Sequence, residues 1–220
     1  VESVDGIVAD LGFSSDQMDD PERGLSFLQE GPLDMRLDQS EHLTAGNIVN
    51  DSSEEVLAQI LRDYGDERFA GRIARAITTV RAEKPLATTA ELAEVVKQSL
   101  PMQYRFGKIH PATKTFQAIR IAVNREPEHL RVFLPQAVSA LKSGGRVAII
   151  SFHSGEDKIV KQVFRENAGG CICPPDFPVC QCKQKPRVRL VTKKPVAPSE
   201  EEVTRNPRSR SARLRIAEKV

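Results

Sequence analysis

Two periods of apolar residues divide the chain into predicted strands and helices. Residues 4–10 form a largely apolar run with the pattern of a buried strand, which ends in an acid, and residues 146–153 form another apolar run. Such compact runs are typical of strands buried in a parallel sheet, so the second is predicted to be central. Residues 187–192 and 212–217 alternate charged and apolar positions, which predicts two further strands, each near an edge of the sheet.

Between the two apolar runs the period changes to that of amphipathic helices. Capping boxes at residues 52–55 and 88–91 predict the starts of two helices. A third helix carries Phe69, Ile73, Ile77 and Val80 on one stripe. A helix beginning near residue 110 should bury Phe116, and another over residues 127–141 should stop at the glycine pair 144–145. The helical block interrupts the α/β pattern.

This order predicts a discontinuous α/β domain with an inserted all-α domain. We expect the α/β part to comprise residues 1–35 and 109–220, and the inserted helical domain residues 36–108. No apolar run has membrane-spanning length and no signal-peptide pattern is found, so we expect a cytoplasmic protein with no membrane partner.

The net charge of +2 conceals an uneven distribution. Residues 183–220 hold twelve Lys and Arg against four Glu, and the preceding residues are mildly acidic. A basic tail suits a polyanionic partner such as nucleic acid, although a solvated C-terminal segment would look the same.

Polar residues follow both apolar runs at the point where each strand should end. Asp10, with Gln17 shortly after it, follows the first, and Ser151, His153 and Asp157 follow the second. Ligands bind at the carboxyl ends of strands in open α/β sheets, so neighbouring strands would face both sets into one crevice. A turn-capping Asp10 and a purely structural His153 are the plainer alternatives.

Two enzyme classes are disfavoured by missing motifs. A Ser/His/Asp hydrolase needs a Gly-x-Ser-x-Gly turn, and Phe152 stands two residues before Ser154. A nicotinamide oxidoreductase needs a Gly-x-Gly-x-x-Gly turn, which the sequence lacks.

Four cysteines cluster within twelve residues, at positions Cys171, Cys173, Cys180 and Cys182. Two thiol pairs on a short loop can hold a structural zinc ion, but the spacing differs from the common two-residue one. A reduced, metal-free thiol cluster stays open as the alternative.

Several segments together resemble one enzyme family. They are VDGIVADLGFSSDQMDDPERGLSF, GPLDMRLD, YGDERFAGRIARAI, TTAELAEVV, HPATKTFQAIRIAVN, GGRVAIISFHSGEDKIVK and NPRSRSARLRIAEK. The chain resembles the S-adenosylmethionine-dependent methyltransferases that methylate cytosine N4 in 16S (small-subunit) ribosomal RNA, often called ribosomal RNA small subunit methyltransferase H.

The resemblance implies a fold, a cofactor and site residues. The fold would be the C-terminal part of a Rossmann-like class I methyltransferase sheet with an inserted helical substrate-recognition domain. Asp10 and Gln17 would contact S-adenosylmethionine, and His153 and Asp157 would line the catalytic side. The partner would be small-subunit ribosomal RNA or the 30S subunit, gripped by the arginines Arg72, Arg75, Arg208, Arg210, Arg213 and Arg215; a homodimer is also possible.

The family also carries a Gly-Gly-His turn and an acidic ribose-binding residue upstream of the matched segments, and we expect this sequence to be truncated at its N-terminus. The alternative function is therefore a catalytically incompetent fragment that acts only as an RNA-binding module.

Overall fold

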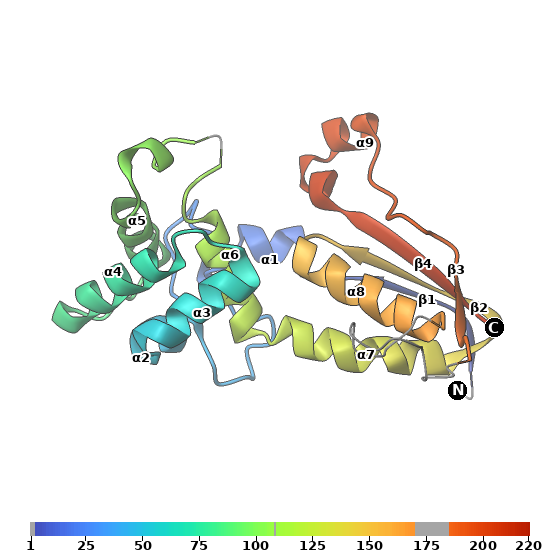
Figure 1. The fold of residues 1–220 in the computed structure, drawn as a ribbon. Helices are drawn as coiled ribbons and strands as arrows, with labels where there is room; N and C mark the ends of the chain where they lie inside the picture. The colour runs from blue at the N-terminus through green and yellow to red at the C-terminus, as the bar shows by residue number, and fades with distance from the viewer. Residues whose placement is uncertain (1–2, 108, 170–184) are drawn as a thin grey trace, which may run out of the picture. The chain divides into compact units, whose positions relative to one another are not determined.

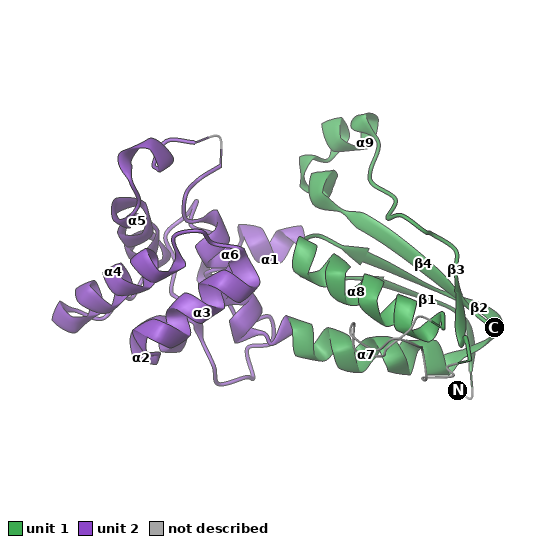
Figure 2. Ribbon diagram, viewed as in Figure 1, with its two compact units in different colours: residues 1–12, 127–220 green, residues 13–126 purple. Residues whose placement is uncertain are grey.

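The computed structural model describes residues 3–107, 109–169 and 185–220 (Figure 1). The chain folds into two compact units: unit 1 combines residues 1–12 and 127–220, and unit 2 is residues 13–126 (Figure 2). The predicted domain bounds at residues 36 and 108 lie inside unit 2. They do so because flanking residues such as Leu25 and Phe116 share the hydrophobic core of unit 2. The fold is mixed α/β.

Unit 1 contains a four-stranded sheet in the order β1-β2-β4-β3. The strands are β1 (Val4–Asp10), β2 (Leu141–Ser151), β3 (Val188–Leu190) and β4 (Arg213–Lys219). Strand β2 is parallel to β1 and antiparallel to β4, which confirms both apolar runs as neighbouring strands. Strands β3 and β4 both lie near an edge, as predicted: β3 is the edge strand, and β4 pairs with β3 on one side and β2 on the other.

Two helices cover one face of this sheet. Helices α7 (Glu126–Ala140) and α8 (Ser154–Asn167) run along the strands, and their apolar residues form one core with β2, β3 and β4 (Figure 1). The short helices α9 (Glu200–Arg205) and η3 (Pro207–Ser211) precede β4.

The predicted glycine stop after α7 is wrong. Helix α7 ends at Ala140 and β2 begins at the next residue, so Gly144 and Gly145 lie within the strand. Gly144 has φ +79°, and a Cβ on Gly145 would lie 3.1 Å from the carbonyl oxygen of Asp5. The register of the pairing between β1 and β2 shifts between Val4 and Gly6, opposite these glycines. The glycines therefore accommodate an irregularity in the sheet and do not end a helix.

Unit 2 is mostly helical. Its elements are α1 (Ser15–Asp19), η1 (Pro21–Arg23), α2 (Ala45–Asp51), α3 (Glu54–Gly65), α4 (Ala70–Glu83), α5 (Thr89–Ser99), η2 (Met102–Tyr104) and α6 (Thr113–Val123). The predicted stripe of α4 is confirmed at Ile73 and Ile77, which are fully buried, but it is wrong at Val80, which is 38% exposed near the end of the helix. Helix α3 packs against α4 and α6, and its Gly65 permits the close approach, since a Cβ there would lie 2.8 Å from the carbonyl oxygen of Lys114.

The two predicted capping boxes had different outcomes. At α5 the box is present: Thr88 caps the helix, and the Glu91 carboxylate accepts the N–H groups of Ala87 and Thr88 and pairs with Lys84 at 2.9 Å. The hydrogen bond from Ala87, and then that from Lys84, lowers the pKa of Glu91 to about 2. At α3 the predicted start is wrong by one residue, because Ser52 ends α2 and Ser53 becomes the cap.

In the part of the chain that the structure describes, no helix is both long and apolar enough to cross a membrane.

Candidate functional site

The two polar strand ends of unit 1 lie side by side. Asp10 is in register with Ile150 of the parallel strand β2, and the N–H of Leu11 donates to the Ile150 carbonyl oxygen at 3.0 Å. Asp10 and the residues that follow β2, including His153, therefore lie at the same end of the sheet, where the carboxyl ends of β1 and β2 meet. This is the adjacency that the sequence predicted for the two strand ends.

Asp10 is the residue at this end of the sheet whose chemistry suits the expected cofactor. Its carboxylate is exposed at the carboxyl end of β1 and is followed by Gly12, which has φ +94°. A carboxylate accepts hydrogen bonds, and the ammonium, ribose hydroxyl and adenine amino groups of S-adenosylmethionine are all donors. The position and chemistry of Asp10 thus fit a cofactor-binding acid.

His153 is held at the start of α8 by a neighbouring acid. The Glu156 carboxylate accepts the N–H of Phe152 at 2.8 Å, and its other oxygen lies 3.4 Å from His153 Nε2. Both side chains are largely buried. Gly155 leaves room for the ring, since a Cβ there would lie 3.1 Å from His153 Nδ1. The imidazole is therefore fixed beside a carboxylate at the start of α8.

Asp157 and Arg215 form a buried ion pair. The guanidinium donates to both carboxylate oxygens, from Nε at 2.6 Å and from Nη2 at 2.8 Å. The side chain of Arg215 is 8% exposed and that of Asp157 is 22% exposed. This geometry does not fit the prediction that Arg215 contacts RNA, because its donors are directed into the protein. Arg215 also occupies both oxygens of Asp157, the carboxylate that was predicted to line the catalytic side.

The other predicted RNA-binding arginines are more accessible. Arg208 and Arg210 lie exposed on η3, and Arg213 at the start of β4 is half-buried and donates to the Ala212 carbonyl. In unit 2, Arg72 is exposed on α4, and Arg75 is exposed with an ion pair to Glu54 at 3.3 Å. The structure thus places these arginines in two separate groups, one on each unit.

Gln17 forms part of a helix cap in unit 2. Its amide oxygen accepts the N–H of Ser14 at 2.9 Å, while the Ser14 hydroxyl accepts the N–H of Gln17. The capping box fixes the side chain at the start of α1 and leaves the amide NH₂ as the group that would bind a cofactor.

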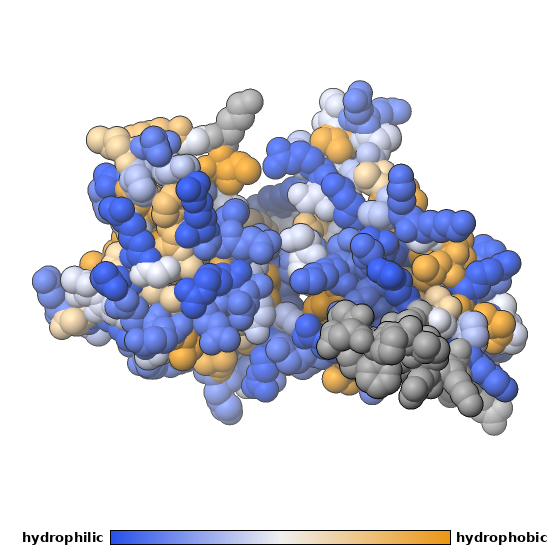
Figure 3. Space-filling model, in the orientation of Figure 1, coloured by the Kyte–Doolittle hydropathy of each residue, from blue (hydrophilic) through white to orange (hydrophobic). Residues whose placement is uncertain are grey.

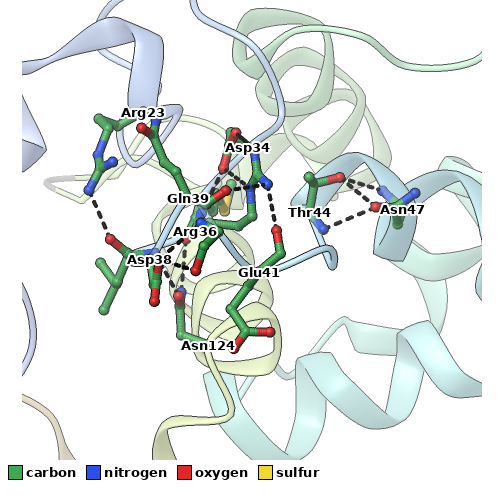
Figure 4. Close-up of polar contacts among 12 residues, drawn as sticks. Arg23, Asp34, Arg36, Asp38, Gln39, Glu41, Thr44, Asn47 and Asn124 are labelled. Carbon is green, nitrogen blue, oxygen red and sulfur yellow. Dashed lines mark hydrogen bonds and ion pairs between the residues drawn. The ribbon is translucent and has the colours of Figure 1, made fainter.

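A loop that the sequence reasoning left unassigned is strongly ordered by polar contacts (Figure 4). Asp34 accepts two hydrogen bonds from the Arg36 guanidinium, at 2.9 and 2.7 Å, which keep the pKa of Asp34 below its usual value. Arg36 also donates to the carbonyl oxygens of Gln39 and Glu41. The loop is thereby closed around one guanidinium.

Asn124, the C-cap residue of α6, also holds this loop through hydrogen bonds. Its amide donates to the Met35 carbonyl at 2.8 Å and accepts the N–H of Leu37 at 2.7 Å. Met35 is fully buried and has φ +60°, an unusual value for a side chain of its size. The sequence signal for this loop was the segment GPLDMRLD, whose charged residues flank a buried methionine.

One cavity of unit 1 is lined by residues of α8, β3 and β4. It has a volume of about 260 Å³ and is lined by Lys161, Phe164, Arg165, Leu190, Thr192, Lys193 and Arg215. Ligand pockets usually have volumes of about 300–1,000 Å³, so this one is small for a whole cofactor. The predicted cysteine cluster, in turn, lies outside the described residues.

Comparisons with known proteins identify relatives along the whole sequence. Residues 1–220 match the model of the MraW methylase family. The chain is 53% identical over 220 residues to "Ribosomal RNA small subunit methyltransferase H" of Halothermothrix orenii, covering 100% of the chain and 71% of that protein. Proteins of the same name from Heliobacterium modesticaldum and Clostridioides difficile are 51% and 48% identical. They align with 99% and 100% of the chain and with 69% and 71% of their own lengths.

Proposed function

Because the chain belongs to the MraW methylase family, we infer that it is an S-adenosylmethionine-dependent methyltransferase that acts on small-subunit ribosomal RNA. The match over the entire chain carries this conclusion. The finer proposal is that the acceptor is the exocyclic N4 of a cytidine, presented in the RNA itself or in the 30S subunit.

The proposed reaction centre is the end of the sheet in unit 1 where the carboxyl ends of β1 and β2 meet. When bound, S-adenosylmethionine supplies an electrophilic methyl group on a sulfonium. Asp10, at the end of β1, would accept hydrogen bonds that hold the cofactor. For Gln17, which belongs to unit 2, the proposal is a cofactor contact through its amide NH₂, as the family resemblance implies. Correct placement of the two reacting atoms is the largest rate effect open to such a displacement.

We propose that His153 is the general base of the reaction. The lone pair of cytosine N4 is delocalised into the ring, so the amine must lose a proton as it gains a methyl group. His153 would accept that proton, and Glu156 beside it would stabilise the resulting imidazolium. The target base must leave its stack to reach the site.

Asp157 has a different proposed role from the one suggested by the sequence. Because both of its oxygens accept hydrogen bonds from Arg215, it acts as a positioning residue that joins α8 to β4. It thereby fixes the helix on which His153 is the cap.

RNA binding is assigned to both units. The proposed phosphate contacts are Arg208, Arg210 and Arg213 in unit 1 and Arg72 and Arg75 in unit 2, with unit 2 as the substrate-recognition domain. Arg215 is removed from this set. A protein that only binds RNA is the second candidate function, favoured by these accessible arginines.

Two measurements separate the candidates. Labelled S-adenosylmethionine and undermethylated small subunits are incubated with the protein, and the digested RNA is searched by mass spectrometry for N4-methylcytidine. Calorimetry with S-adenosylmethionine measures cofactor binding by itself. RNA binding without cofactor binding or methyl transfer would reject the enzyme and leave the binding module.

Variants then test the assigned residues. Asp10→Ala is expected to weaken S-adenosylmethionine at least about tenfold, the loss of roughly one charged hydrogen bond. His153→Ala should lower kcat about 10²-fold or more with unchanged cofactor affinity, as for a lost general base. Glu201→Ala, on the exposed helix α9, is the control and should behave as wild type. Unchanged turnover in His153→Ala would remove His153 from the mechanism.

A further inference from the structure

Unit 2 exposes a group of large apolar side chains just after α5. Met102 is 70% exposed, Phe106 is 76% exposed and Ile109 is 62% exposed, and Tyr104 is 38% exposed. Figure 3 shows hydrophobic residues at this end of unit 2 next to hydrophilic ones. Single exposed apolar residues are ordinary, whereas contiguous exposed apolar surface is typical of interaction sites.

Two cations lie against the rings of this group. The Arg68 guanidinium lies 5.6 Å from the ring centroid of Phe69 and 5.9 Å from that of Tyr104, and it donates to the Tyr104 hydroxyl at 3.3 Å. Phe69 and Tyr104 are 4.9 Å apart between centroids. The Lys97 ammonium lies 5.9 Å from the ring centroid of Phe106. Positive charge and aromatic surface therefore occur together. We call Arg68, Phe69, Lys97, Tyr104 and Phe106 the aromatic patch.

The segment that carries Tyr104 and Phe106 is anchored to α5. Arg105 donates from Nε to the Leu100 carbonyl at 2.8 Å and from Nη2 to the Gln98 carbonyl at 2.7 Å. The N–H of Tyr104 donates to the Pro101 carbonyl at 2.8 Å. These hydrogen bonds hold the backbone between Tyr104 and Phe106 against the end of α5, so both rings have a fixed point of attachment.

The charge of the surroundings favours a polyanion over a protein surface. Two acids lie beside patch residues: Glu94 is 4.0 Å from Lys97, and the largely buried Glu67 accepts the N–H of Phe69 at 2.9 Å. Against them stand the cations Arg68 and Lys97 of the patch and the exposed Arg72 on α4. Aromatic rings flanked by cations are the usual means of binding unpaired nucleotides: bases stack on the rings while cations contact phosphates.

We propose that the aromatic patch binds unpaired bases of the RNA substrate, with Tyr104 and Phe106 as stacking surfaces and Arg68 and Lys97 as phosphate contacts. The proposal rests on the proposed function, since it names how that substrate is held. It adds a base-stacking surface to unit 2, where the sequence had indicated only arginine contacts.

The test is RNA affinity measured by fluorescence anisotropy without cofactor. The probes are a labelled single-stranded RNA oligonucleotide of mixed sequence and the same strand in a perfect duplex. Phe106→Ala and Tyr104→Ala should each weaken single-strand binding about 5- to 150-fold, the range for loss of one stacked base, and change duplex binding little. Phe106→Trp should restore single-strand binding, because it keeps an aromatic face.

A matched control separates stacking from general loss of apolar surface. Val132→Ala removes a side chain that is 60% exposed on α7 and should leave both affinities unchanged. Unchanged affinity for single-stranded RNA in both alanine variants would overturn the proposal. An equal loss of affinity for single-stranded and duplex RNA would also overturn it, because it would indicate binding through charge without base stacking. Retained RNA binding together with loss of a protein partner in Phe106→Ala would assign the patch to protein docking and also overturn it.

The failure of this inference is distinct from that of the proposed function. If the protein transfers no methyl group but the Phe106→Ala variant binds single-stranded RNA more weakly, the enzyme assignment fails and the proposed role of the aromatic patch is supported. If it methylates RNA while both alanine variants bind strands normally, the patch fails and the enzyme stands.

Discussion

Removal of the Asp157 carboxylate should destabilise unit 1 strongly. Asp157→Ala leaves the Arg215 guanidinium, only 8% exposed, without its bidentate partner. Breaking a buried ion pair by removing one partner costs about 3–5 kcal/mol. Asp157 itself is 22% exposed, so water compensates in part and the lower end, about 3 kcal/mol, applies. For a chain of this size that corresponds to a fall of about 6–12 °C in Tm.

Differential scanning calorimetry is suited to this measurement, because the chain has no tryptophan to report unfolding by fluorescence. The double variant Asp157→Leu with Arg215→Met replaces the pair with apolar groups and should recover most of the lost stability. The control is Glu201→Ala, which removes an exposed pair with Arg205 and should change the free energy of unfolding by less than about 0.5 kcal/mol.

One result would refute the positioning role of Asp157. If Asp157→Ala is as stable as Glu201→Ala and yet loses turnover, the carboxylate acts directly in the chemistry. If stability and turnover fall together and the double variant recovers both, the pair acts through the structure.

Three further predictions concern unit 2. Since the pKa of Glu91 is lowered to about 2, the stability that its carboxylate gives to the folded state is complete above about pH 4.5 and is lost as the pH falls towards 2. In urea denaturation followed by circular dichroism, Glu91→Gln should flatten this fall in the free energy of unfolding. A pH dependence equal to that of the wild type would contradict this. Asn124→Ala should cost about 2–4 kcal/mol by the same measurement, because Met35 and Leu37 lose their partners; a cost below about 1 kcal/mol would show that the loop holds itself. Gly65→Ala should destabilise by about 1–3 kcal/mol, whereas Gly71→Ala, with nothing within 4 Å of its Cβ, should stabilise by about 0.5–1 kcal/mol; equal effects would refute the close approach at α3.

The sequence determined the features that arise within a few residues. The sequence predicted the strand that ends at Asp10, the cap at Thr88 and the burial of Ile73 and Ile77 on α4, and all of these are observed. Each depends on a local period or on a side chain bonding to its own backbone, and neighbouring positions in the sequence contain that information. The order of polar residues after two apolar runs was likewise sufficient to place Asp10 and His153 at one end of the sheet.

The tertiary structure decided where distant residues meet. Arg215 looked like one more arginine of a basic tail, and only the fold brings it to Asp157, 58 residues away. Gly144 and Gly145 looked like a helix stop until the pairing of β1 with β2 required an irregularity there. The strained Met35 depends on Asn124, which lies 89 residues further along the chain. Such contacts follow from packing among whole elements, which no short stretch of sequence specifies.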